Sequence, residues 1–364
     1  MEFEMWGNFP FEIQLEITKR VPVKSLIPLS CVSNQCKSLI DSPEFIADQT
    51  NLLVRVKVGS EENYFSDDDG VTHLSFSPII PPSIKLGTIL SFLGCSHGLV
   101  GMHGVYRYKE VRCKMDVRGE VRCHMVVFWN PSIRKSVGIE IRREFDVIGF
   151  GVCPGTRDPK IIAINNSSPS KAAEVYTLSS RAWRSISTNL QRWPLSSVSH
   201  SSKPVVIDGV VHWIVCDTFP RRIVSFDLTS DEFSEVELPD DFAHPRYLSI
   251  LNFKGSLAVL VYTEAELFCD VWTIGDPSSC FTKVSTVSLS RRGERVIGFR
   301  KNGQIITEHV SIMPEHSQVT TLEAYSEHNN RHLASVAFNS YILKTSYTKS
   351  LLLLNHSDSA ILWL

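Results

Sequence analysis

The 364-residue sequence predicts a mainly β fold with a small all-α segment at its amino terminus. Apolar residues recur at helical spacing in the first fifty residues, and from Gly94 onward two strand-like patterns repeat along the chain. At this length, and with 43% hydrophobic residues, the chain can bury one large core and one small one.

The first helix is expected between Asn8, which can cap its amino end, and Pro22, which stops it. Pro10 suits the first turn, and acidic residues precede basic ones, as the helix dipole favours. Leu15 lies off the main apolar stripe of this helix. That stripe consists of Phe9, Ile13, Ile17 and Val21.

Three further short helical turns are expected before residue 50. Ser25 can cap one that carries Leu26 and Leu29, and Pro28 is tolerated there because the N–H it lacks would have no intrahelical acceptor. Ser33 can cap the next turn, and Ser42-Pro43 starts the last one. These two turns present Cys36, Leu39, Ile40 and Phe45.

The short helices cannot bury all their apolar side chains among themselves, and each Leu or Ile left in water forgoes roughly 1.5–3 kcal/mol. Either a second polypeptide or the β domain of the same chain must cover them. Periodicity alone does not separate these alternatives, because a helix stripe looks the same in both cases.

The first repeating pattern is an apolar strand that follows a turn. Its copies are SHGLVGM, RDPKIIAI, IDGVVHWIV, FKGSLAVLVY, RKNGQIITE and YTKSLLLL. The markers Leu99, Ile161, Val210, Leu257, Gln304 and Leu351 lie 62, 49, 47, 47 and 47 residues apart. Such an even interval predicts a repeated structural unit.

The second repeating pattern is a hairpin of alternating residues around a polar turn. Its aromatic markers Phe128, Tyr176, Phe226, Trp272 and Tyr325 are 48, 50, 46 and 53 residues apart. A unit of this length built from short strands predicts the blade of a β-propeller, and the six apolar strands predict a roughly six-bladed ring. A sandwich of open sheets is the alternative, although sandwiches seldom keep so even a period.

The two ends of the β region are expected to close the ring. Either Leu52–Val58 or Thr72–Ser77 would share a blade with the final segment SAILWL. Joining the first and last strands would hide the sheet edges and fix both ends of the chain.

An insertion lengthens the first interval, and it contains a duplication: EVRCKM, residues 110–115, recurs as EVRCHM, residues 120–125. A turn at Arg118-Gly119-Glu120 would place Met115 opposite Cys123 and Cys113 opposite Met125. The basic residues Arg112, Lys114, Arg118 and Arg122 are candidates for binding an acidic target. A solvated loop is the alternative, because acidic residues are interleaved with them.

No pattern for bond chemistry, a metal or a cofactor stands out. Cys113, Cys123 and His124 lack the paired spacing of a zinc site, and Asp67–Gly70 lacks the distal carboxylate of a calcium loop. Phosphate loops, dinucleotide motifs and nucleophile elbows are also missing. The acidic pair Asp240-Asp241 suits a turn, and His212 is expected to be a structural residue within a strand.

The net charge and the cysteine content limit the partners and the cellular compartment that we expect. A net charge of −2 provides no field toward nucleic acid or an anionic membrane. The amino terminus lacks the order of a signal peptide, and eighteen apolar residues never run together. We therefore expect a protein of the cytosol or nucleus, with its nine cysteines reduced.

A set of motifs lies in order along residues 9–45: Phe9-Pro10, Ile13, Ile17, Arg20–Leu26, Leu29, Cys31–Ser33, Ser38–Ile40, Ser42-Pro43 and Phe45. This set resembles an F-box of the plant type. The resemblance implies docking on the Skp-type adaptor of a cullin-based ubiquitin ligase. The implied adaptor contacts are Pro10, Ile13, Ile17, Val21, Pro22, Leu26, Leu29, Val32, Leu39 and Ile40.

Two positions depart from the family pattern. Thr18 stands where an aliphatic residue is usual, and Cys36 replaces the usual tryptophan. Because aromatic residues tend to dominate interface energy, a lower affinity for the adaptor is expected.

A second set of motifs follows: Gly94–Val100, Trp129–Lys135, Gly149–Gly151, Val175–Leu178 with Trp183, Gly209–Trp213, Ser225–Leu228 and Asp270–Trp272. These resemble the F-box-associated domain of plant F-box proteins. Val152-Cys153-Pro154 departs from the family pattern, which usually has a Tyr-Asp pair there. The resemblance implies an F-box at 1–50, a linker with ring-closing strands at 51–93, and a target-binding propeller at 94–364.

Together the two resemblances imply the substrate-recognition subunit of an SCF-type ligase, which catalyses no reaction itself and acts by holding its target beside a ubiquitin-charged enzyme. Two other classes stay open. One is a propeller scaffold whose adaptor docking is weakened or lost. The other is a propeller enzyme, which would need a cluster of acids, tyrosines or metal ligands at its axis.

Overall fold

A computed structural model of the protein describes the following residues: 9–21, 25–26, 28–29, 33–40, 42, 45, 50–58, 61–67, 76–79, 82–107, 122–141, 145, 147–165, 172–188, 190, 203–215, 221–242, 247–263, 267–275, 280–300, 304–312, 318–326, 332–338, 341–348, 350–353 and 360–362.

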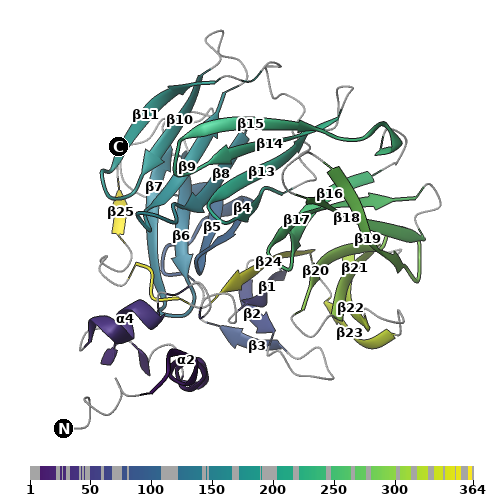
Figure 1. Cartoon of the computed structure of the whole chain (residues 1–364), viewed down its shortest axis with the longest axis horizontal. Coiled ribbons are helices and arrows are strands. Elements are labelled where there is room, and N and C mark those ends of the chain that lie inside the picture. Colours follow the sequence, from purple (N-terminus) through teal and green to yellow (C-terminus); the bar gives the residue numbers. More distant parts are fainter. Residues whose placement is uncertain are drawn as a thin grey trace.

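Within the described residues, five four-stranded sheets and one five-stranded sheet follow one another around the molecule (Figure 1). Blade 1 contains β4 (Thr88–Ser96), β5 (Leu99–Arg107), β6 (Arg122–Asn130), β7 (Lys135–Ile141) and β25 (Ala360–Leu362). Blade 2 contains β8 (Val147–Val152), β9 (Pro159–Ile164), β10 (Ala172–Thr177) and β11 (Ala182–Ser187). Blade 3 contains β12 (Val205–Ile207), β13 (Val210–Val215), β14 (Arg222–Asp227) and β15 (Glu232–Glu237).

The remaining three blades complete the ring. Blade 4 contains β16 (Tyr247–Phe253), β17 (Ser256–Tyr262), β18 (Phe268–Gly275) and β19 (Cys280–Ser288), and it follows a short 3-10 helix, η1 (Asp240–Phe242). Blade 5 contains β20 (Arg295–Phe299), β21 (Gln304–Ile312), β22 (Gln318–Ser326) and β23 (His332–Phe338). Blade 6 combines β24 (Tyr341–Thr348) with β1 (Thr50–Val58), β2 (Glu61–Asp67) and β3 (Phe76–Ile79).

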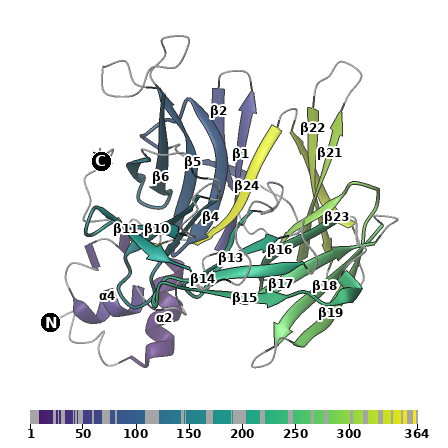
Figure 2. The ribbon, with the colours of Figure 1, turned by 90° about the horizontal axis from the view of Figure 1, so that it is seen from above.

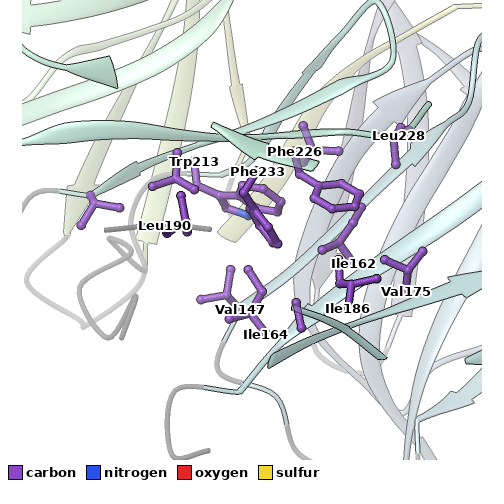
Figure 3. Close-up of a cluster of buried hydrophobic side chains, with 14 of the residues drawn as sticks. Val147, Ile162, Ile164, Val175, Ile186, Leu190, Trp213, Phe226, Leu228 and Phe233 are labelled. Carbon is purple, nitrogen blue, oxygen red and sulfur yellow. The ribbon is translucent and has the colours of Figure 1, made fainter. Parts of the chain in front are cut away.

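A separate buried apolar cluster joins each blade to the next. Between blades 2 and 3, for example, Ile162 and Val175 face Trp213 and Phe226 (Figure 3). Corresponding clusters lie between blades 1 and 2, 3 and 4, 4 and 5, 5 and 6, and 6 and 1. Because all six junctions are packed, the ring is closed, and the prediction of a propeller with about six blades is confirmed.

The two sequence repeats occupy fixed places in the blades. Copies of the apolar pattern form the second strands β5, β9, β13, β17 and β21, and the hairpins form the third and fourth strands of blades 1–5. The prediction of a strand around Leu351 is wrong, because residues 350–353 form no strand. The second strand of blade 6 is β1, which comes from the other end of the propeller sequence.

The prediction that Leu52–Val58 helps to close the ring is correct, because these residues belong to β1. The prediction that the final segment SAILWL pairs with it is wrong. β1 pairs with β24 over eight residue pairs, from Thr50–Thr348 to Lys57–Tyr341. Ala360–Leu362, from the final SAILWL segment, instead pairs in parallel with β7 in blade 1. A strand of eight residues can pair along nearly all of the nine-residue β1, whereas three residues can only extend an existing edge. Figure 2 shows β24 beside β1.

The predicted pairing of Cys113 with Met125 in the insertion is also wrong, whereas that of Met115 with Cys123 stays a prediction. Cys123 lies opposite Tyr106, and Met125 lies between Gly104 of β5 and Glu140 of β7. Met125 therefore already has a strand partner on each side, so Cys113 cannot lie opposite it. Residues 108–121 lie outside the described part of the chain.

Two helices that precede the propeller are described over their full length, and residues 25–26, 28–29 and 45 are also helical. α2 (Phe11–Arg20) begins after Pro10, which holds the N-cap position, so the expectation that Asn8 caps this helix is wrong. α4 (Asn34–Ile40) is capped as expected, since the Ser33 hydroxyl accepts the N–H of Gln35 at 3.2 Å. No helix in the described ranges is long and apolar enough to cross a membrane.

Candidate functional site

Helix α2 has two faces of different character. Gln14, Leu15 and Thr18 are buried on one face. The residues Phe9, Phe11, Ile13 and Ile17 are exposed by 43, 46, 47 and 38%, respectively. Burying such side chains against a partner would be favourable, so the stripe Phe9, Ile13 and Ile17, which we call the outer face, is a candidate interaction surface. Phe11 is exposed at the first turn, on the side of Gln14.

The opposite side of the helices is covered by the chain's own propeller. Leu15, Leu26, Leu39, Ile40 and Phe45 form one buried cluster with Leu351, and Val21, Leu29 and Ile133 pack at its margin. Leu351 and Ile133 belong to the propeller region, where the helices lie beside blade 1 (Figure 1). The inner residues therefore dock on the same chain, whereas the outer face stays exposed.

Glutamine side chains connect the two helices beneath the outer face. Gln14 Nε2 donates a hydrogen bond to the Phe9 carbonyl at 2.7 Å, and Gln35 Nε2 donates to Gln14 Oε1 at 3.4 Å. A groove runs along this junction, lined by Phe9, Phe11, Gln14, Gln35, Ser38 and Leu39. The groove is apolar at its phenylalanine side and polar at its glutamine side, which suits a protein surface.

Charged residues lie at the carboxyl end of α2. Glu16 forms ion pairs with Lys19 at 3.0 Å and with Arg20 at 3.6 Å. These pairs are on the surface, where an ion pair contributes about 0–1 kcal/mol, so they form a polar rim rather than an anchor. The outer face can therefore bind an apolar partner, and it presents no nucleophile.

The structure divides the predicted adaptor contacts into groups. Pro10, Ile13 and Ile17 are exposed, and Val21 and Leu29 are half-buried. Leu26, Leu39 and Ile40 are buried in the inner cluster, where they support the helices from beneath. Pro22 and Val32 lie outside the described residues.

Sequence reasoning missed Phe11, Gln14, Gln35 and Ser38 of the groove. Phe11 lies at a helical position, and its exposure could have been inferred only with the orientation of the helix known. Gln35 and Ser38 come from α4, and no sequence signal places α4 beside α2.

Thr18 and Cys36 are buried within the chain, with exposed fractions of 5% and 6%. The Thr18 hydroxyl donates to the Gln14 carbonyl at 2.7 Å, one helical turn earlier. Neither side chain therefore belongs to the outer face. The predicted effect of these two positions on adaptor affinity stays a prediction.

Of the candidate target-binding residues, one begins β6 and the other three precede it in the sequence. Arg122 is the first residue of β6 and pairs with Arg107, while Arg112, Lys114 and Arg118 fall outside the described residues. Their role stays a prediction. The expectation that all cysteines are reduced is wrong for Cys123, which forms a disulfide, whereas Cys36, Cys153 and Cys269 are free.

His212 and the pair Asp240-Asp241, which the sequence singled out, lie within regular elements of the fold. His212 lies beside Ser225 on the next strand, 2.7 Å from its hydroxyl, and burial lowers the pKa of His212 to about 4. Asp240 and Asp241 lie in η1. Over the part of the chain that the structure describes, no three His, Cys, Asp or Glu side chains gather in a way that could hold a metal ion.

Comparison with known families agrees with this two-part structure. Residues 88–348 match the family described as the F-box associated beta propeller domain, and residues 6–48 match the F-box domain. The chain belongs to this F-box-associated family. Its helices α2 and α4 lie in the F-box match, and blades 1–5 lie almost wholly in the propeller match.

Relatives of the F-box protein come from Arabidopsis thaliana. The F-box protein At1g30790 is 28% identical over 314 residues, covering 74% of this chain and 72% of the relative. The F-box protein At4g19940 is 25% identical over 336 residues, covering 82% and 79%. The F-box/kelch-repeat protein At3g23880 is 24% identical over 308 residues, covering 78% and 79%.

Proposed function

We propose that this protein is the substrate-recognition subunit of an SCF-type ubiquitin ligase. Residues 1–50 would dock on a Skp-type adaptor and, through it, on a cullin, while residues 94–364 would hold the target protein. Residues 51–93 would link the two parts and supply strands that close the ring. Such a subunit would act in the cytoplasm or nucleus.

The observation that supports the proposal most directly is the exposure of the outer face. Ile13 and Ile17 point away from a helix whose other side is packed against the propeller. The propeller thus keeps the F-box helices in place without covering Ile13 or Ile17. Two exposed β-branched residues beside Phe9 could supply the apolar centre of a protein interface.

The proposed role requires no catalytic group. A receptor raises the effective concentration of the target's lysines near the charged enzyme, and this proximity is its contribution to the rate. The target would contact loops at the ends of the blades, since such loops carry recognition on a rigid scaffold. The basic residues Arg112, Lys114, Arg118 and Arg122 are proposed contacts for an acidic target.

The test is binding of the full chain to a purified Skp-type adaptor. The double variant Ile13→Asp/Ile17→Asp places two charges at the proposed interface, where each unpaired buried charge would be costly. We expect adaptor affinity to fall at least tenfold. Ile312→Asp is the matched control, because Ile312 is 79% exposed on β21, outside the F-box, and should leave the affinity unchanged.

The same binding measurement distinguishes the ligase role from the alternative function. If the unmutated chain does not associate with the adaptor, the ligase role is refuted, and a propeller scaffold with lost adaptor docking takes its place. If the double variant binds as well as the unmutated chain, the outer face is not the docking surface.

A further inference from the structure

Asn130 connects two distant parts of the chain. It is the last residue of β6 and is fully buried. Its Nδ2 donates to the carbonyl oxygen of Ser350 at 3.0 Å and to that of Leu352 at 2.9 Å, and it lies 3.3 Å from the Ser350 hydroxyl. Its Oδ1 accepts the N–H of Ser132 at 2.9 Å. One side chain thus supports both a local turn and a remote segment.

The equivalent turn of blade 3 separates these two roles. Asp227 ends β14 as Asn130 ends β6, and its Oδ1 accepts the N–H of Thr229 at 2.6 Å and that of Ser230 at 3.2 Å. A carboxylate therefore suffices to shape the turn. The amide of Asn130 adds a donor, and both carbonyls it reaches belong to residues 350–353.

The segment 350–353 lies between the propeller and the F-box helices. Leu351 joins the inner cluster with Leu15, Leu26 and Leu39, and Leu353 joins the cluster between blades 1 and 2. Ile133, from the turn after Asn130, packs against both clusters. The hydrogen bonds from Asn130 therefore hold the surface on which the helices rest.

We propose that Asn130 is a positioning residue, which fixes the orientation of the F-box on the propeller by holding residues 350–353 beneath the helices. The functional consequence rests on the proposed ligase role, because orientation matters only if a target on the propeller must be presented to an enzyme bound through the F-box. Small errors in position between reacting groups lower a rate steeply.

Asn130→Asp is the decisive variant. It keeps the acceptor that the turn needs and replaces the donor by a carboxylate oxygen facing the carbonyls of Ser350 and Leu352. Asp227→Asn is the matched control, since it exchanges the same two groups in a turn that bears no F-box. Leu351→Ala is a second variant, which removes the apolar contact to the helices and leaves Asn130 intact.

Hydrogen exchange of the full-length variants measures the outcome. For Asn130→Asp and Leu351→Ala, we expect exchange in α4 and in residues 350–353 to become roughly tenfold to hundredfold faster, as loss of a buried hydrogen-bond partner predicts. Exchange in blades 3–5 should not change, and Asp227→Asn should match the unmutated chain. Unchanged exchange in α4, or faster exchange spread evenly over all blades, would overturn the proposal.

A second measurement keeps this inference distinct from the proposed function. With a purified Skp-type adaptor, Asn130→Asp should retain the affinity of the unmutated chain, because the outer face is untouched. If the unmutated chain fails to bind, the ligase role falls, and hydrogen exchange still decides whether Asn130 orients the helices. Where binding holds, self-ubiquitination in a reconstituted ligase should spread over more of the propeller's own lysines in Asn130→Asp than in Asp227→Asn.

Discussion

The indole ring of Trp213 occupies the position at which residue 149 would carry a Cβ atom. Gly149 lies in β8 of blade 2, and Trp213 lies in β13 of blade 3. The absence of a side chain at 149 therefore lets the large ring pack directly on the neighbouring backbone. The same relationship recurs where the ring of Phe150 fills the Cβ position of Gly101, between blades 1 and 2.

Substitution of Gly149 should destabilise the propeller. The tetrapeptide Val-Ile-Gly-Phe occurs twice, at residues 147–150 and 296–299, in the first strands of blades 2 and 5. We expect Gly149→Ala to lower the free energy of unfolding by about 1–3 kcal/mol, the usual effect of overpacking a core. Gly298→Ala is the control, because no described atom lies within 4 Å of its Cβ position. Chemical denaturation monitored by tryptophan fluorescence would measure both, and equal losses would contradict this account.

Two buried tyrosines should respond differently to loss of their hydroxyl groups. The Tyr262 hydroxyl in blade 4 accepts the backbone N–H of Val296 in blade 5 at 2.9 Å. Tyr262→Phe would leave that buried N–H unpaired, which costs about 1–3 kcal/mol. The Tyr176 hydroxyl is buried and has no hydrogen-bond partner among the described residues, so Tyr176→Phe should be neutral or slightly stabilising. Urea denaturation compares the two, and similar effects would refute the assignment.

His212 should make the propeller less stable in acid. Burial lowers its pKa from 6.5 to about 4, so the unfolded chain binds more protons than the folded chain between these pH values. Its contribution is fully present above about pH 6.5 and is lost as the pH falls through 4, amounting to on the order of 3 kcal/mol. The pKa of His103 is lowered to about 4 in the same way.

His212→Gln removes the titrating group and can keep a hydrogen bond to Ser225. We expect the free energy of unfolding to depend less steeply on pH between 6.5 and 4.5, and the double variant with His103→Gln to be flatter still. Denaturation at a series of pH values gives the slopes. A slope as steep as that of the unmutated chain would show that these histidines do not couple folding to pH.

Neighbouring positions on α2 should differ in their effect on stability. Leu15 is 8% exposed in the inner cluster, whereas Ile17 is 38% exposed on the outer face. Leu15→Ala should destabilise the F-box by about 2–5 kcal/mol, and Ile17→Ala by less than about 0.5 kcal/mol. Hydrogen exchange of α2 in the full chain measures both. Comparable exchange in the two variants would contradict the assignment of Leu15 to the covered side of α2 and of Ile17 to its exposed side.

The period of the sequence was sufficient to predict the repeated unit, because each blade needs one apolar strand at its centre and one alternating hairpin outside it. Leu99, Ile161, Val210 and Leu257 therefore lie in equivalent second strands. The same reasoning failed at Leu351, where the apolar pattern continues but the strand does not. The second-strand position of blade 6 is already filled by β1, which comes from the amino-terminal side of the propeller sequence. Leu351 therefore packs under the F-box helices instead.

Local sequence determined the helix cap at Ser33 and the turn at Ser42, whose hydroxyl accepts the N–H of Phe45 at 3.2 Å. It also determined the repeat and the separation of Leu15 from Ile13 and Ile17, because these depend on spacing along a few residues. Tertiary structure alone decided which side of α2 is covered, which strand closes the ring, and that Asn130 reaches residue 350. These contacts join residues hundreds of positions apart, and their geometry is set by how blades and helices pack, which no local pattern encodes.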